Sequence, residues 1–197
     1  EYVTSGLRLT VSNEIAIKKR EMGEMTITPE DMEARTARFK KLSYSAEGYL
    51  DTRIPAHERN TYNVIGRGVT EDPNLSPAIT DAQDFNLTYI GAEPGKGAAL
   101  HDHPTVEVFI PMTGTWAIIW GDEGQFETTI EQFDVVSVPP GVMRGFRNES
   151  NEHGFIMAIL GGSNSGSVSW AGSVIGEAEK TGLKLNEDGT ISELVPA

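Results

Sequence analysis

Two histidines and a glutamate lie close together in the middle of this 197-residue chain. His101 and His103 are separated by one residue, and Glu107 follows four residues after the second histidine. In an extended strand, residues of the same parity point to the same face, so we expect these three side chains to converge. Two imidazole nitrogens and one carboxylate oxygen suit a divalent transition metal, and they leave coordination positions open for oxygen or a substrate. The spacing therefore predicts a metal site.

A single histidine on a strand more often bonds a backbone carbonyl than a metal. Three polar side chains on one buried face are harder to explain that way, because each would need its own hydrogen-bond partner. The number of polar groups on this face therefore favours the metal interpretation over three separate structural hydrogen bonds.

Two glycines frame the group, with Gly95 six residues before His101 and Gly114 seven residues after Glu107. This spacing matches the first of the two sequence signatures of the cupins, and the chain resembles that family over about residues 80–162. The resemblance implies an all-β fold, a double-stranded β-helix, with the metal inside the wider mouth of the barrel. Short strands separated by turns, which the sequence itself shows, agree with an all-β barrel or sandwich.

The second cupin signature is met only in part. It is matched at Pro139, Gly141 and Asn148. Phe133 stands where a glycine is usual, and Arg144 stands where the family's last metal-binding histidine is usual. A guanidinium stays protonated in proteins, so Arg144 cannot replace that histidine as a ligand.

Arg144 leaves three interpretations open. The site could use three protein ligands, with Arg144 as a catalytic residue that binds a carboxylate or enolate oxygen of the substrate. His153 could supply the missing ligand from the next strand. Arg144 could instead pair with Glu107 and take the place of the metal, which would leave a cupin that binds small molecules without chemistry.

The resemblance implies a mononuclear metal enzyme, and we expect an Fe(II)-dependent dioxygenase that acts on a small oxygenated or aromatic compound. Manganese, nickel or zinc would also suit these ligands. A redox-neutral isomerase or lyase of a hydroxy- or keto-acid is the alternative reaction class, with the metal as a Lewis acid. Phe109, Phe146 and Trp116 are candidates to line the pocket and exclude water, and we expect only some of them to do so, because such aromatic residues more often belong to the core.

Composition limits the partners. The chain has 29 acidic and 16 basic residues and a net charge of −13, which disfavours nucleic acid and anionic lipid. It has no cysteine, which agrees with a reducing compartment, and no run reaches the about 20 apolar residues of a membrane helix. We therefore expect a cytoplasmic protein with a small-molecule substrate.

We expect three regions along the chain. Residues 1–79 would form an N-terminal arm, a helix and a loop region, with the helix capped by Thr28 and running to about Leu42. Residues 80–162 would form the barrel. Residues 163–197 would form an extension with a short helix that Gly182 ends. The arm and the extension offer surfaces for a homodimer, the assembly that the resemblance implies.

Overall fold

The computed structural model describes residues 27–187 and 189–194. Contacts between residues divide the chain into two units, Glu1–Thr36 and Ala37–Ala197. The N-terminal arm expected before Thr28 lies almost entirely outside the described residues. The three regions expected from the sequence stay a prediction, and the structure adds that a strand from residues 1–79 belongs to a sheet of the barrel.

Helix α2 spans Pro29–Ala34 and begins as the sequence predicts. The Asp31 amide donates to the Thr28 hydroxyl over 3.1 Å, and the Thr28 amide donates to the Asp31 carboxylate over 3.1 Å. The expected length, to about Leu42, is wrong. The helix buries none of its residues, and a helix this short gains little stability without packing. A separate 3-10 turn, η1, follows at Phe39–Lys41.

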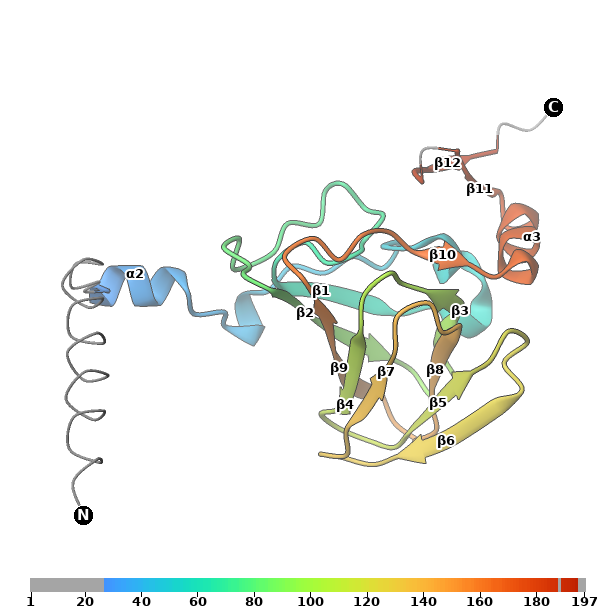
Figure 1. The fold of residues 1–197 in the computed structure, drawn as a ribbon, viewed down its shortest axis with the longest axis horizontal. Helices are drawn as coiled ribbons and strands as arrows, with labels where there is room; N and C mark the ends of the chain where they lie inside the picture. Colours follow the sequence, from blue (N-terminus) through green and yellow to red (C-terminus); the bar gives the residue numbers. More distant parts are fainter. Residues whose placement is uncertain (1–26, 188, 195–197) are drawn as a thin grey trace, which may run out of the picture. The chain divides into compact units, whose positions relative to one another are not determined.

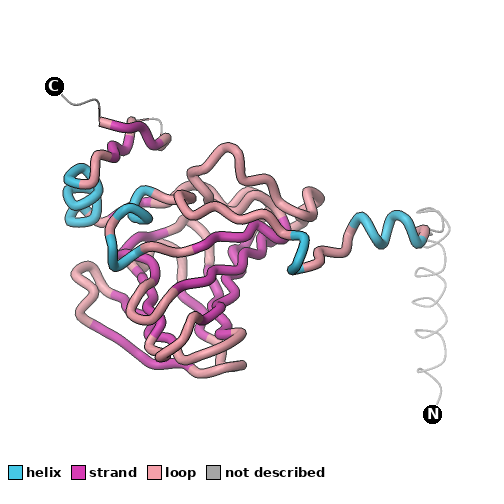
Figure 2. Tube along the Cα trace, turned by 180° about the vertical axis from the view of Figure 1, so that it is seen from behind, coloured by secondary structure: helices cyan, strands magenta, loops and turns pink. Residues whose placement is uncertain are grey.

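Two five-stranded antiparallel sheets make up the barrel, with strand orders β1-β2-β9-β4-β7 and β10-β3-β8-β5-β6 (Figure 1). The strands run over Asn60–Ile65 (β1), Phe85–Ala92 (β2), Gly97–Asp102 (β3), Glu107–Pro111 (β4), Trp116–Trp120 (β5), Phe126–Ile130 (β6), Val136–Val138 (β7), Arg144–Asn148 (β8), Gly154–Gly161 (β9) and Ser169–Trp170 (β10). This is the all-β double-stranded β-helix that was expected. Seen from behind, the second unit consists of strands joined by long loops, with little helix (Figure 2).

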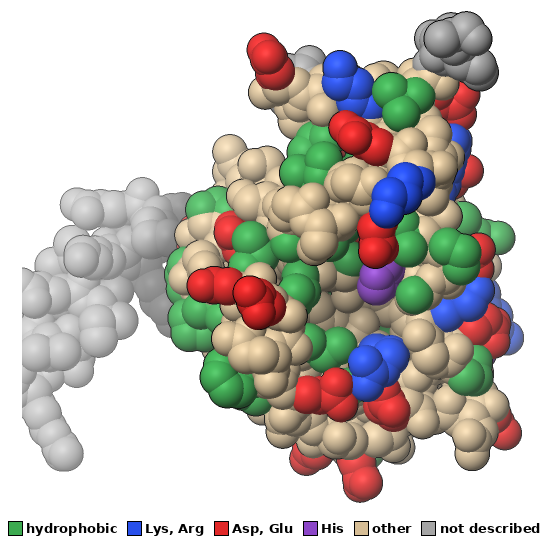
Figure 3. Space-filling view, turned by 90° about the vertical axis from the view of Figure 1, so that its right-hand side faces the viewer, with side chains coloured by type: hydrophobic (Ala, Val, Ile, Leu, Met, Phe, Trp, Pro, Cys, Tyr) green, Lys and Arg blue, Asp and Glu red, His purple; other side chains and the backbone are tan. Residues whose placement is uncertain are grey.

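The core lies between the two sheets. Its largest members are aromatic and aliphatic side chains that alternate along the strands: Phe109, Trp116, Ile118, Phe146 and Ile156. This alternation is what a barrel with one inward face per strand requires. Acidic, basic and apolar side chains are interspersed on the face seen in Figure 3.

A second apolar cluster lies against the outside of β3 and β10. The 3-10 turn Leu50–Arg53 (η2), Ile54 after it, and helix α3, Gly172–Lys180, contribute to it, and a second 3-10 turn, Pro55–His57 (η3), follows η2 in the chain. Helix α3 buries Val174 and Ala178, and Gly182 follows it with a φ of 88°. The short C-terminal helix is therefore confirmed, and the hairpin Leu183–Leu185 (β11) and Ile191–Glu193 (β12) follows it. Among the described residues, no helix has the length and apolar character needed to cross a membrane.

Candidate metal centre

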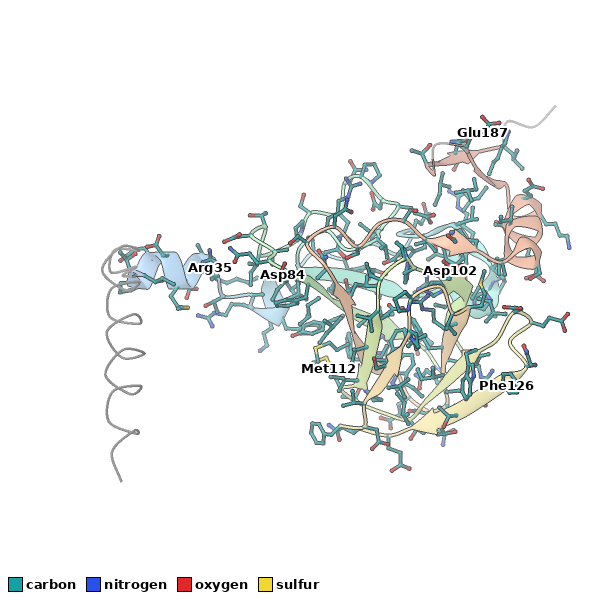
Figure 4. All side chains as sticks on the ribbon, in the orientation of Figure 1. Arg35, Asp84, Asp102, Met112, Phe126 and Glu187 are labelled. Carbon is teal, nitrogen blue, oxygen red and sulfur yellow. The ribbon has the colours of Figure 1, made fainter. Side chains whose placement is uncertain are left out.

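The stretch that carries the candidate ligands crosses from one sheet to the other. His101 lies on β3, Glu107 begins β4, and His103 lies in the connection between them. The single extended strand expected through these residues is therefore wrong. Pro104 accounts for the break, since it lacks an amide hydrogen for the ladder and restricts the backbone of His103. Asp102, labelled in Figure 4, marks the end of β3.

The crossing still brings the three side chains together. Their ligand atoms all lie within 4.8 Å of one another. His101, His103 and Glu107 are 6%, 1% and 4% exposed, so the cluster is screened from bulk water. Burial of three ligand-type side chains at this separation is a strong indication that the cluster can hold an ion, because each group needs a polar partner there.

The protein backbone fixes both imidazole rings. Nδ1 of His101 lies 2.7 Å from the Ala99 carbonyl, and Nδ1 of His103 lies 3.3 Å from the Ser167 carbonyl. A carbonyl oxygen only accepts, so each Nδ1 donates its proton and each Nε2 keeps a free lone pair. Nε2 of His103 is 3.6 Å from Oε2 of Glu107. Histidines that bind metals in proteins are commonly oriented by this kind of second hydrogen bond.

The electrostatics of the cluster favour neutral imidazoles. Burial lowers the pKa of His101 well below its usual value, and the neighbouring His103 adds to the effect. Burial and the positive charge of Arg144 lower the pKa of His103 to about 4. Burial raises the pKa of Glu107 to about 7, and the Arg144 guanidinium opposes that rise. Neutral imidazoles are the form that binds a metal ion.

Arg144 lies directly across from His101, on the paired strand β8. Its Nε donates to Oε2 of Glu107 over 3.0 Å, and its Nη1 donates to the Val142 carbonyl over 3.0 Å. Its Nη2 is buried and has no partner among the described residues. The contact with Glu107 occupies one carboxylate oxygen, so the other oxygen stays available for an ion.

The structure does not bring His153 into the cluster. This histidine is exposed, and its ring packs against Phe155 with the ring centroids 4.8 Å apart. Glu107 pairs with Leu160 near the far end of β9. His153 precedes that strand, seven residues from Leu160, which corresponds to about 23 Å along an extended chain. Its depth in the barrel is therefore wrong for a fourth ligand.

A cavity of about 30 Å³ adjoins the cluster. Its wall contains His101, His103 and Glu107 and apolar residues of the barrel. The rest of the wall, called the outer wall below, is formed by residues outside the barrel core: Tyr49, Arg59, Val69, Val168 and Trp170. Of the three aromatic candidates to line the cavity, only Phe146 does so. Phe109 and Trp116 are fully buried behind Phe146, with ring centroids 5.3 and 5.9 Å from it.

Sequence reasoning missed the outer wall of the cavity. Arg59 is 6% exposed, and its Nη2 lies 2.8 Å from Oδ1 of Asp51. Its guanidinium also lies 4.9 Å from the centre of the Tyr49 ring. The Trp170 ring lies 5.4 Å from the His101 ring. These residues come from segments far from the ligands in sequence, and no local pattern marks them.

Comparison with known proteins agrees with this geometry. Residues 89–160 match the family described as Cupin domain. No curated protein matches the chain significantly. One similar solved structure is the polyketide cyclase RemF from Streptomyces resistomycificus, at 13% identity and a TM-score of 0.51, with 68% of this chain and 82% of that chain covered.

Two further solved structures are similar. A mutant of the oxalate decarboxylase of Bacillus subtilis matches at 14% identity and a TM-score of 0.51, over 68% of this chain and 31% of that chain. A cupin 2 domain-containing protein from Halorhodospira halophila matches at 18% identity and a TM-score of 0.47, over 62% of this chain and 77% of that chain. At these identities the two structures with a TM-score of 0.51 show the fold alone. The match to the Cupin domain family over residues 89–160, together with the double-stranded β-helix, identifies the barrel of this chain as a cupin domain.

Proposed function

We propose that this chain is a mononuclear metal-dependent enzyme in which His101, His103 and Glu107 hold Fe(II). One observation carries the proposal: both buried imidazoles donate Nδ1–H to backbone carbonyls and keep Nε2 free beside a buried carboxylate. Two histidines and one carboxylate are the ligand set of many non-haem iron oxygenases. Further support comes from the lowered pKa values of both histidines, since a neutral imidazole needs no deprotonation before it binds the ion.

The proposed reaction is dioxygenation of a small oxygenated or aromatic compound. A ferrous ion would supply activation of molecular oxygen at this site. Apolar side chains of the cavity, such as Ile90, Phe146 and Leu160, would exclude bulk water from the reacting atoms. Arg144 does not line the cavity, so it would act from behind the ligands: its Nε would orient Glu107, and its buried positive charge would attract a carboxylate or enolate oxygen of the substrate.

Elemental analysis of protein purified without chelator or nickel affinity resin tests the metal. About one iron per chain is expected, because the described residues hold one such cluster. His101→Ala should lose the iron, and the matched control His153→Ala should keep it, since that histidine lies outside the cluster. Oxygen uptake with a panel of small oxygenated and aromatic compounds then tests the reaction. Equal metal content in both variants would refute the proposed ligands.

A redox-neutral reaction is the second candidate. The buried guanidinium of Arg144 favours it, because a fixed positive charge beside the cluster suits a hydroxy- or keto-acid. Manganese, nickel or zinc in place of iron, with turnover that consumes no oxygen, would support this isomerase or lyase. The Arg144–Glu107 contact also favours a third candidate, a non-catalytic small-molecule binder. Native protein without metal, and an Arg144→His variant that gains it, would support the binder.

We also propose that the chain forms a homodimer. Aromatic side chains gather on the outer face of the sheet that contains β1 and β9. Phe39 and Tyr44 are 48% and 56% exposed, and both rings lie within 5.5 Å of the Tyr62 ring. Exposed aromatic groups are enriched at protein interfaces. Sedimentation of the full chain should give a mass of two chains, and a monomer mass at micromolar concentration would refute the proposal.

A further inference from the structure

The cavity beside the candidate ligands is too small for an organic substrate. Its volume is about 30 Å³, and one water molecule needs roughly 10–15 Å³ on the same kind of measure, so about two waters fit. Pockets that hold small organic molecules usually measure about 300–1,000 Å³. A substrate that reaches the ligands must therefore extend into a neighbouring space.

A cleft of about 360 Å³ provides that space. One wall is formed by residues 67–71 and the other by residues 163–168. Val69 and Val168 line both this cleft and the cavity at the candidate ligands. These two valines therefore form the boundary through which a molecule in the cleft could reach the cluster.

The walls of the cleft are polar and carry little net charge. Arg67 contributes one positive group, and Glu71 contributes a carboxyl group whose pKa burial raises to about 7. Ser163 accepts a hydrogen bond from the Asp84 amide over 2.9 Å, and Ser165 accepts one from Asn86 over 2.6 Å. Ser165 is 1% exposed, so its hydroxyl holds the wall together, whereas the exposed Ser163 hydroxyl keeps its own hydrogen as a donor. The exposed hydroxyls of Ser163 and Ser167, in walls with little net charge, suit a ligand that carries uncharged hydroxyl groups.

The two walls are held in place and joined to the cluster. Asn86, from β2, donates to the Gly162 carbonyl over 2.8 Å and accepts from the Gly68 amide over 3.2 Å, so it connects both walls. The Ser167 carbonyl bonds the His103 ring. Because the same loop forms a wall of the cleft and orients a candidate ligand, the cleft is a built part of the site.

We propose that this cleft binds the hydroxylated part of the substrate, while the reacting end of the same molecule passes between Val69 and Val168 to the cluster. The proposal rests on the metal-dependent function proposed above. The substrate would be a small molecule with a metal-binding oxygen group at one end and a polyhydroxylated chain at the other. A flat aromatic substrate without hydroxyl groups would leave the polar walls without partners.

Three hydroxamates test the cleft in the full chain loaded with zinc. Acetohydroxamate has a metal-binding group and almost no chain, whereas hexanohydroxamate and gluconohydroxamate have six-carbon chains without and with hydroxyl groups. Calorimetric titration should show gluconohydroxamate binding about tenfold more tightly than either of the others, which is roughly the gain from one or two added hydrogen bonds.

Substitutions in the cleft test whether the tighter binding of gluconohydroxamate arises there. Val168→Phe narrows the boundary and should reduce the advantage of gluconohydroxamate to less than about twofold. Val135→Phe adds the same bulk at a position that is 61% exposed, and it should leave the advantage unchanged. If Val168→Phe does not fold, Arg67→Trp fills the cleft from the opposite wall and should have the same effect.

Two results would overturn the proposal in distinguishable ways. Equal affinities of the three probes for zinc-loaded protein, or a gluconohydroxamate advantage that both cleft variants retain, would refute the cleft and leave the metal site standing. Failure of the chain to bind zinc or any other divalent transition metal would refute the metal-dependent function and the cleft together.

Discussion

Replacing Glu107 by glutamine tests the contact between this carboxylate and Arg144. The side chains of Arg144 and Glu107 are 0% and 5% exposed, and Nε lies 3.0 Å from Oε2. Removing one charge from such a buried pair leaves the other uncompensated, at a cost of about 3–5 kcal/mol. For a protein of this size, 1 kcal/mol corresponds to roughly 2–4 °C in Tm. Above pH 7, where the Glu107 carboxyl group is ionised, Glu107→Gln should therefore lower the Tm of metal-free protein by about 6–20 °C.

A surface pair with the same separation is the matched control. Nη2 of Arg147 also lies 3.0 Å from a carboxylate oxygen, that of Glu127, but these side chains are 38% and 46% exposed. Pairs of this kind contribute about 0–1 kcal/mol, so Glu127→Gln should change Tm by less than about 4 °C. Differential scanning calorimetry after chelation measures both variants. Similar shifts in the two would show that burial does not set the strength of the Arg144–Glu107 contact.

Three further predictions concern other parts of the molecule. Burial raises the pKa of Glu71 from 4.5 to about 7, although Trp170 donates a hydrogen bond to it over 3.0 Å. The folded protein therefore holds this proton more tightly than the unfolded chain does, and its stability falls as pH rises from 4.5 through 7. Between pH 5 and 8, the Tm of the wild type should fall relative to that of Glu71→Gln. Gly97→Ala would place Cβ 1.9 Å from the Phe146 carbonyl, so it should sharply lower Tm or prevent folding, whereas Gly176→Ala, with nothing within 4 Å, should not. Metal at 100 times its Kd should stabilise the chain by about 2.7 kcal/mol, and chelation should reverse the resulting rise in Tm.

The alternation of His101, His103 and Glu107 along the sequence correctly predicted that the three side chains converge, although the backbone that brings them together is not the single strand that was expected. Same-parity residues converge on one strand, and they also converge here, where the chain leaves β3 at Asp102 and enters β4 at Glu107. Alternation alone cannot distinguish a continuous strand from a crossing between two sheets, because the backbone hydrogen bonds to neighbouring strands decide where a strand ends. Pro104 was the local sign of a break, and its meaning depended on which sheet the following residues joined.

The residues around the cluster were harder to predict than the cluster. Phe109, Phe146 and Trp116 are equally apolar in the sequence, and only their depth in the barrel places Phe146 at the cavity and the other two behind it. Arg59 and Trp170 reach the cavity from distant segments, through tertiary packing. Local patterns describe which face a residue occupies, whereas depth and long-range neighbours depend on the whole fold.

The crossing of the chain between sheets also affects the kinetics of unfolding. His101 belongs to the sheet that contains β8, and Glu107 belongs to the sheet that contains β9. An ion held by both residues would link the two sheets of the barrel, so the sheets could separate only after a ligand bond broke. Interactions that are lost before the transition state for unfolding slow that reaction. Metal binding should therefore lengthen the lifetime of the folded barrel, so that the resistance of the chain to irreversible inactivation depends on the rate of metal release.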